Sequence, residues 1–387
     1  MSFISKCPYC KNAFEAEEQW VGRAALCPSC GRRIVIQFGD ESAPGTAGSN
    51  RRQSNPPPPP HFGTRAEDIR RNAGETIRET FKLDKLEGFS CAGFMHQVFK
   101  RHTWDEIEEY MTVGTPRNIP PLGEVQPVWP APWLFLRTML FTLMLYLFLV
   151  WRIDDFGVYG VLPLLIIGVI GIPFAALLFF WEVNIPQNIS ILSLLRVVIV
   201  SGFASIAITL VVNKLIGPEH PIWAGPIEET AKALIMLLFI RTQKHRFKLN
   251  GLLIGAAVGT GFAMIETGGY VLAPILSKHA SEGIATMELR ALLAPFMHIP
   301  WSAIVGFALW RAHASRGSLS ANMMSPVFIP LFAFAVGLHM FWNSEILKDE
   351  FIIRTAVVGV IEYSLIIYLI QEGINEVRRI RERGEGY

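Results

Sequence analysis

Eight long apolar segments follow one another between residues 133 and 370 of this chain. Each is close to the ~20 residues that an α-helix needs to cross the hydrocarbon core of a bilayer. Short hydrophilic breaks separate them, and most lack the polar face that a helix of a soluble protein carries. We therefore predict an all-α polytopic membrane protein with about eight transmembrane helices. The predicted spans are approximately 133–151, 157–181, 190–212, 222–240, 249–273, 289–310, 324–343 and 352–370.

The composition agrees with a membrane protein. Hydrophobic types make up 51% of the 387 residues and charged types only 18%, whereas a soluble domain usually carries about 25% charged residues. These values exclude a single soluble domain, a disulfide-rich secreted scaffold and a fully disordered chain. The net charge of +2 is too small for a nucleic-acid surface, so no nucleic-acid partner is predicted. Tryptophans lie near the segment ends, as in an interfacial aromatic belt, at positions 129, 133, 151, 181, 223, 310 and 342.

Basic residues predict the orientation of the chain in the membrane. With eight spans, the breaks after the fourth and sixth spans and the C-terminal tail lie on one side, and these carry most of the basic residues outside the spans. They are Arg241, Lys244, Arg246, Lys248, Arg311, Arg316, Arg378, Arg379, Arg381 and Arg383. The opposite breaks hold little more than Arg152, Lys214, Lys278 and Lys348. The positive-inside rule therefore predicts cytoplasmic termini, in the plasma (inner) membrane.

Two pairs of cysteines near the N-terminus predict a zinc ribbon. Cys7 and Cys10 form one C-x-x-C turn, Cys27 and Cys30 form the other, and sixteen residues separate the pairs. This spacing is typical of a structural zinc ion held by four thiolates. Two disulfides are the alternative, but residues 1–6 contain no apolar region of a secretion signal. Zinc is therefore favoured, and it agrees with a reducing cytoplasm.

The remaining divisions follow from composition. Residues 1–38 form the small β zinc ribbon, and residues 39–63 are a Pro/Gly/Ser-rich linker that cannot bury enough apolar surface to become ordered. Residues 64–132 are a cytoplasmic amphipathic helical and extended segment, in which Thr103 and Glu106 form a predicted capping box. Residues 133–370 are the transmembrane domain, and residues 371–387 are a basic cytoplasmic tail.

Polar and ionisable residues recur within four successive predicted spans, where charges are costly and usually functional. They are Glu228, Glu229 and Lys232 in the fourth span, Glu266 in the fifth, His298 in the sixth, and His339 and Asn343 in the seventh. Counted along each helix at ~1.5 Å per residue, the acidic and imidazole groups fall in the same half of the bilayer. We therefore predict one polar cavity that opens to the extracytoplasmic side. A structural ion pair between Glu228 and Lys232, four residues apart, is the plainer alternative for those two residues.

This set of residues suits hydrolysis. Adjacent carboxylates in an apolar setting cannot both ionise easily, so one of them is suited to take a proton from water. His339 and Asn343, one turn apart, are candidate donors to an oxyanion. Alternatively the histidines and Glu266 hold a zinc ion that activates the water, although no H-E-x-x-H helix is present.

At these residues the sequence resembles the PrsW family of intramembrane proteases, which is related to the CAAX-protease and bacteriocin-processing superfamily. The matching motifs are Glu228-Glu229-x-x-Lys232, Phe262-x-x-x-Glu266, His298 in its Pro/Trp setting and His339-x-x-x-Asn343. The resemblance implies that residues 133–370 are a peptidase domain that cleaves a membrane-associated protein.

The resemblance also implies roles for these residues. Glu228 corresponds to the water-activating base, and His339 with Asn343 to the oxyanion donors. Glu229, Glu266 and His298 are helpers or metal ligands. Family members are often labelled metalloproteases, and the active-site metal stays open at this point.

Two other functions remain as alternatives. The first alternative is a non-enzymatic membrane scaffold or sensor, in which the ribbon docks a cytoplasmic protein partner. The second is an ion-coupled transporter. The absence of an evident internal repeat argues against an inverted-repeat transporter.

Overall fold

The computed structural model divides the chain into two compact units, residues 1–62 and 63–387, which are described separately below. The residues that the structure describes are 2–7, 12–17, 24–26, 33–35, 75–90, 99, 101–115, 117–217, 220–240, 246–277, 280–316 and 323–384.

The N-terminal unit contains two short antiparallel hairpins. Strand β1 (Ser2–Lys6) pairs with β2 (Ala13–Glu17), and β3 (Ala24–Leu26) pairs with β4 (Arg33–Val35). Cys7 directly follows β1 and is buried in a small cluster with Ile34 and Phe14. Cys10, Cys27 and Cys30 lie outside the described residues, as does the linker at 39–63. The zinc site therefore stays a prediction.

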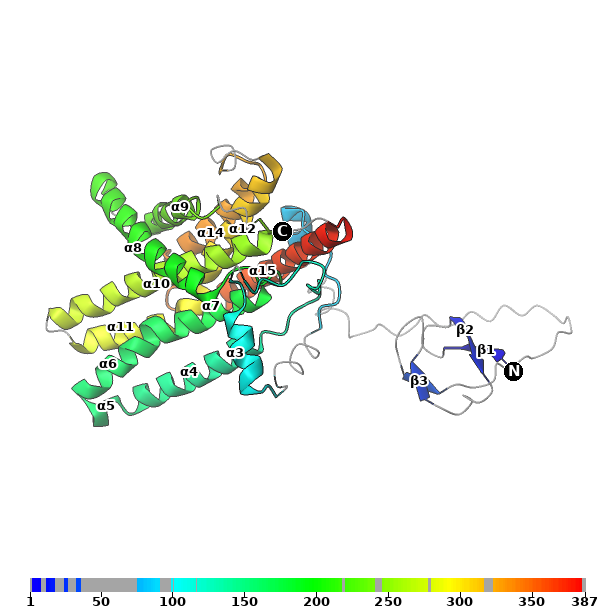
Figure 1. Cartoon of the computed structure of the whole chain (residues 1–387). Coiled ribbons are helices and arrows are strands. Elements are labelled where there is room, and N and C mark those ends of the chain that lie inside the picture. The colour runs from blue at the N-terminus through cyan, green and yellow to red at the C-terminus, as the bar shows by residue number, and fades with distance from the viewer. Residues whose placement is uncertain are drawn as a thin grey trace, which may run out of the picture. The chain divides into compact units, whose positions relative to one another are not determined.

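The second unit is a helical bundle (Figure 1). Helix α3 (Trp104–Thr112) begins with the predicted capping box between Thr103 and Glu106. Among the described residues, six helical stretches are long and apolar enough to span a membrane. The first is α4 (Trp133–Trp151), followed after α5 (Ile153–Phe156) by Tyr159–Val183, which combines α6 (Val158–Ile166), the π-helical turn η2 (Ile167–Gly171) and α7 (Ile172–Val183).

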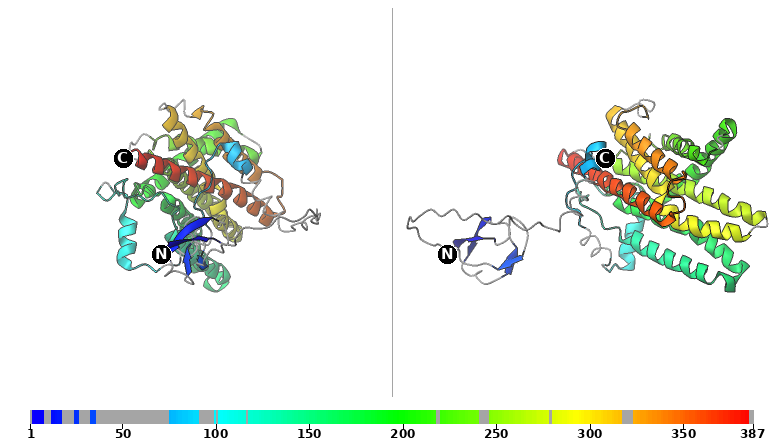
Figure 2. Two further views of the ribbon diagram at one scale, coloured as in Figure 1. Left: turned by 90° about the vertical axis from the view of Figure 1, so that its right-hand side faces the viewer. Right: turned by 180° about the vertical axis from the view of Figure 1, so that it is seen from behind.

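The other four spans follow the same order as the predicted segments. They are α8 (Ile191–Ile216), α10 (Lys248–Leu276), Glu282–His313 and α15 (Phe351–Glu382). The stretch Glu282–His313 is built from α11 (Ala280–Leu293), the single 3-10 turn η4 (Ala294–Phe296) and α12 (His298–Arg316). The right-hand view of Figure 2 shows α15 running along the side of the bundle that faces the viewer.

The predicted count of eight spans is not confirmed. The fourth and seventh segments form the helices α9 (Ala224–Met236) and α14 (Ile329–Trp342), with 13 and 14 residues. At ~1.5 Å per residue these helices are only about 20 Å long, which is short of the ~30 Å hydrocarbon core. The turn η3 (Pro221–Trp223) precedes α9. Hydropathy alone marked both segments as spans, because turn residues at their ends are as apolar as the helices.

Glycines let α10 pack closely against two neighbouring helices. A Cβ atom on Gly255 would collide with the Ser302 carbonyl of α12, and one on Gly259 would collide with the His298 carbonyl. On the other side, Gly261 of α10 meets Gly202 of α8 at similarly close range. These glycines therefore form a packing surface of small residues on α10, which brings the backbone of His298 against that helix.

One end of the bundle collects basic side chains. Lys248 Nζ and Arg311 Nε both pair with Glu372 Oε1, at 2.8 and 3.1 Å. Arg311 also donates to the carbonyl oxygens of Phe81 and Lys82, so the segment before the membrane domain packs on this end. Lys248 and Arg311, which come from the predicted breaks after the fourth and sixth segments, thus meet α15 at one end of the bundle.

Candidate active site

Four helices bring their ionisable side chains to one place. Helix α9 carries Glu228, Glu229 and Lys232, while α10, α12 and α14 carry Glu266, His298 and His339. All of these side chains are buried except Glu266, which is half-buried. The predicted convergence of residues that are far apart in the sequence is therefore present in the structure.

His298 begins α12, directly after the break that η4 and Met297 make in the long helical stretch. Its Nε2 atom lies 2.9 Å from Glu266 Oε2, and its Nδ1 atom lies 4.0 Å from Glu228 Oε2. The break turns the ring toward the other helices, and the close contact at Gly259 fixes its backbone. One ring nitrogen thus meets a carboxylate while the other faces Glu228.

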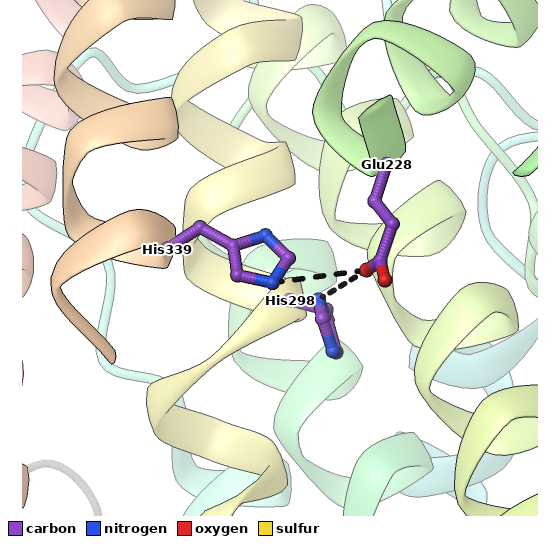
Figure 3. Close-up of side chains that lie close together, drawn as sticks. All are labelled: Glu228, His298 and His339. Atoms are coloured by element: carbon purple, nitrogen blue, oxygen red, sulfur yellow. Dashed lines mark ion pairs between the residues drawn. The ribbon is translucent and has the colours of Figure 1, made fainter. Parts of the chain in front are cut away.

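His339 repeats this arrangement from α14. Its Nδ1 atom lies 3.0 Å from Glu229 Oε1, and its Nε2 atom lies 3.8 Å from Glu228 Oε2. Trp301 packs against the ring, with centroids 4.7 Å apart. Figure 3 shows Glu228, His298 and His339 pointing toward one another from three helices. Two imidazoles, each held by its own carboxylate, therefore converge on Glu228.

Lys232 pairs with Glu229 rather than with Glu228. Its Nζ atom donates to Glu229 Oε1 at 2.6 Å, contacts His298 Nδ1 at 2.9 Å and lies 4.1 Å from the centre of the Phe262 ring. The structural pair of Glu228 with Lys232, which the i,i+4 spacing suggested, is therefore wrong: the i,i+3 pair forms instead. Both spacings bring helix neighbours together, and the position of His298 draws the ammonium toward Glu229.

Glu228 consequently has no ion pair with a lysine or arginine among the described residues. Its Oε2 atom is buried and has no hydrogen-bond partner there, and its nearest ionisable neighbours are the two imidazoles. A carboxylate removed from water without a cation is energetically costly. Such a group is expected to bind something that the protein alone does not provide, such as a proton, a metal ion or a polar substrate.

A cavity of about 450 Å³ gives access to these groups. Glu228, Glu266, His298 and His339 line it, and its walls come from the C-terminal ends of α8 and α14, from η3 and from α11. Asn343 also lines the cavity, but its amide donates to the Pro221 carbonyl at 3.3 Å and not to the carboxylates. Of the predicted site residues, Asn343 thus lies at the wall while the other five form the centre.

Arg290 was missed by the sequence reasoning. It lies on α11, lines the cavity and pairs with Glu266 Oε2 at 2.5 Å. Its guanidinium also lies over the Tyr270 ring at 4.4 Å from the centroid. The signal was available, because an arginine near the start of an apolar span is as unusual as a glutamate there.

The described residues fit a divalent metal ion at one position. Glu228, His298 and His339 each offer a ligand atom, and these atoms lie within 4.8 Å of one another. Two imidazoles and one carboxylate form a common donor set of catalytic zinc sites, and a carboxylate on the far nitrogen of each imidazole is the usual outer-shell partner. The carboxylate ligand in this set is Glu228. The zinc site predicted from the sequence had Glu266 in that position. Lys232 is the one feature against an ion, because its ammonium contacts the same Nδ1 atom of His298.

Comparison with known proteins agrees with this geometry. Residues 189–370 match the model of a family described as PrsW family intramembrane metalloprotease. The matched stretch includes α8 to α14 and so every helix that contributes to the centre of the site. No curated protein and no solved structure matches the chain. The match and the buried site make this integral membrane protein an intramembrane peptidase, whose water is activated by a glutamate or by a metal ion.

Proposed function

We propose that Glu228 accepts the proton of the water that attacks the peptide bond, and that the cavity around it is where a membrane protein is cleaved. The observation that carries this proposal is the charge environment of the carboxylate. Glu229 and Glu266 each have an ion pair of 2.6 Å or less with a lysine or arginine, whereas the described residues give Glu228 no such pair, and the two imidazoles lie 3.8 and 4.0 Å from its Oε2 atom. A desolvated carboxylate without a cation is the strongest proton acceptor in such a group.

The reaction then needs one proton to move twice. The water oxygen attacks the carbonyl carbon as Glu228 takes the proton, and Glu228 then gives this proton to the leaving amine as the C–N bond breaks. Asn343 lines the cavity and is our candidate for a donor to the carbonyl oxygen. Such donors are worth roughly 10²–10³ in rate when they are aimed at the oxyanion.

On the side that faces Glu228, the two imidazole rings are suited to accept a hydrogen bond rather than to donate one. His339 Nδ1 faces the Glu229 carboxylate and His298 Nε2 faces Glu266, so these nitrogens carry the protons. In the neutral rings the opposite nitrogens, which face Glu228, hold lone pairs. This supports a role for both histidines as metal ligands, with the ion taking the place of the Lys232 ammonium at His298 Nδ1. It also makes His339 an oxyanion donor only when the ring is charged.

As the second form of this proposal, in which a metal ion and not the Glu228 carboxylate activates the water, Glu228, His298 and His339 are the residues that would hold the ion. An ion bound there would supply a Lewis acid for the carbonyl oxygen and would lower the pKa of water. The chain's own contribution is to fix the two rings through Glu229 and Glu266 and to keep Lys232 on Glu229, where its charge offsets the buried carboxylate. Glu228 is required in both forms, as the base when no ion is bound and as a ligand when one is.

The cavity is proposed to open on the extracytoplasmic side of the plasma (inner) membrane. It lies near the C-terminal end of α10, at Tyr270, whereas Lys248 begins the same helix at the basic end of the bundle. The positive-inside rule supports this orientation, with the basic end of the bundle and both termini in the cytoplasm. The N-terminal unit is proposed to hold a structural zinc ion with Cys7, Cys10, Cys27 and Cys30 and to dock a cytoplasmic protein.

The experiment is a comparison of membrane-protein fragments in cells that express the wild-type chain or Glu228→Gln. A general base contributes roughly 10²–10⁴ in rate, so we expect Glu228→Gln to abolish the fragments while the protein stays inserted. Glu345→Gln is the matched control, because Glu345 is exposed and pairs only with Lys348 among the described residues. Fragments that persist in Glu228→Gln at wild-type levels would refute the assignment.

A further inference from the structure

Arg290 joins the site by a chain of short contacts. Its Nη2 atom pairs with Glu266 Oε2 at 2.5 Å, and the same carboxylate oxygen lies 2.9 Å from His298 Nε2. The other nitrogen of His298 faces Glu228. We propose that Arg290 is a positioning residue, which acts through Glu266 to hold the His298 ring with its Nδ1 atom toward Glu228. This inference rests on the proposed function of the site.

The side chain of Arg290 is itself held from three directions. Besides the ion pair with Glu266, its Nε atom donates to Thr267 Oγ1 at 3.3 Å, and the guanidinium lies over Tyr270. Glu266, Thr267 and Tyr270 all belong to α10, so Arg290 links α11 to α10 at the level of the site. A planar guanidinium fixes a carboxylate in one orientation, which a lysine ammonium does less well.

The Glu266 carboxylate needs such a clamp because one neighbour repels it and another competes with His298 for it. Glu266 and Glu228 line the same cavity and carry like charges, which repel each other in an apolar environment. Lys232 is the other nearby cation, and its Nζ atom already contacts His298. Without Arg290, we expect Glu266 to leave His298 for water or for Lys232. The ring would then lose the partner of its Nε2 atom, and the Lys232 contact would be left to hold its Nδ1 atom.

Helix α11 does not depend on Arg290 for its own position. Tyr146 donates from its hydroxyl to the Met287 carbonyl at 3.2 Å, and Gly283 packs directly against Val271 and Ile275 of α10. A variant at Arg290 is therefore expected to fold. The main alternative is that Arg290 binds the substrate directly, since it lines the cavity and is 20% exposed.

The test is a double-mutant cycle on the full-length protein in lipid nanodiscs. The variants are Arg290→Gln, Glu266→Gln and the double variant, and the probe is the membrane protein whose fragments depend on Glu228. We expect Arg290→Gln to lower kcat roughly 10–100-fold, as outer-shell variants do, with KM little changed. The kcat of the double variant should be no lower than that of Glu266→Gln alone. Exposed Arg196→Gln is the control and should behave as wild type.

A second measurement follows the ring directly and does not require activity. Nitrogen NMR of the labelled histidines, assigned with His298→Gln, reports which nitrogen of His298 carries the proton. We expect Arg290→Gln and Glu266→Gln to shift the His298 signals in the same way. An unchanged His298 signal in Arg290→Gln, or a rise in KM with losses that multiply in the double variant, would overturn the proposal. Failure of the proposed function itself gives a different result, because the Glu228→Gln variant would then still produce the fragments at the wild-type level.

Discussion

The two ends of α10 carry buried ionic clusters of opposite character. At the basic end, the Lys248 and Arg311 side chains both pair with Glu372, and the backbone N–H of Lys248 donates to Glu376, so two cations lie beside two carboxylates. At the other end, Lys232 and Arg290 face Glu228, Glu229 and Glu266, so two cations meet three carboxylates and two imidazoles. The first cluster is balanced by the protein alone. The second has one carboxylate too many, which is what a site that handles a proton or a metal ion requires.

The comparison shows which buried charges report function. Both clusters are largely buried and both join helices that are far apart in the sequence, so burial and ion pairing do not distinguish them. The balance of charge does. A cluster whose charges cancel stabilises the fold when it is complete, whereas an excess carboxylate beside two oriented imidazoles costs stability and is explained by the chemistry that it performs.

The largest expected effect comes from removing one imidazole of the unbalanced cluster. His339→Ala should lower cleavage about 100-fold or more and should lower the metal content by one ion per chain, because it removes one of three ligands. Metal analysis of the purified full-length protein measures this. His313→Ala is the control, since His313 lies on α12 outside the cavity lining. A metal content that does not change in His339→Ala would leave glutamate alone as the activator of water.

A large effect on stability, but not on chemistry, is expected at the balanced end. Glu372→Ala leaves Lys248 and Arg311 without their shared carboxylate oxygen, and breaking a buried pair from one side costs about 3–5 kcal/mol. Thermal unfolding in detergent measures the loss, with exposed Glu345→Ala as the control. The folded fraction should keep a wild-type kcat. A kcat that falls as far as in Glu228→Gln would remove the distinction between the two ends.

A smaller effect is expected in the middle of α10, which joins the two clusters. Gly255→Ala pushes a methyl group into the backbone of Ser302, Ala303 and Gly306, and overpacking of this kind costs about 1–3 kcal/mol. Gly337→Ala in α14 is the matched control, because nothing lies within 4 Å of the added atom. It should stabilise the helix by roughly 0.5–1 kcal/mol. Equal unfolding temperatures for the two variants would contradict the close packing of α10 on α12.

Local patterns in the sequence determined most of the helices and most of the site's membership. Apolar length predicted all six spans, four of them within about four residues of their observed bounds, and the Thr103–Glu106 box began α3. The span Glu282–His313 begins earlier and α15 ends later than predicted, at residues too polar for the hydropathy pattern to include. Charged and imidazole groups in apolar segments identified Glu228, Glu229, Glu266, His298 and His339. These inferences succeed because helix length, capping and the cost of a charge in lipid act within one segment.

Only the tertiary structure decided how these groups are paired. The spacing along α9 allows Lys232 to meet either Glu228 or Glu229, and the choice depends on where the break before His298 places an imidazole from another helix. The role of Arg290 and the shortness of α9 and α14 depend in the same way on contacts between helices. A carboxylate is left without a cation only when all of its neighbours have been placed, and no single segment of sequence contains that information.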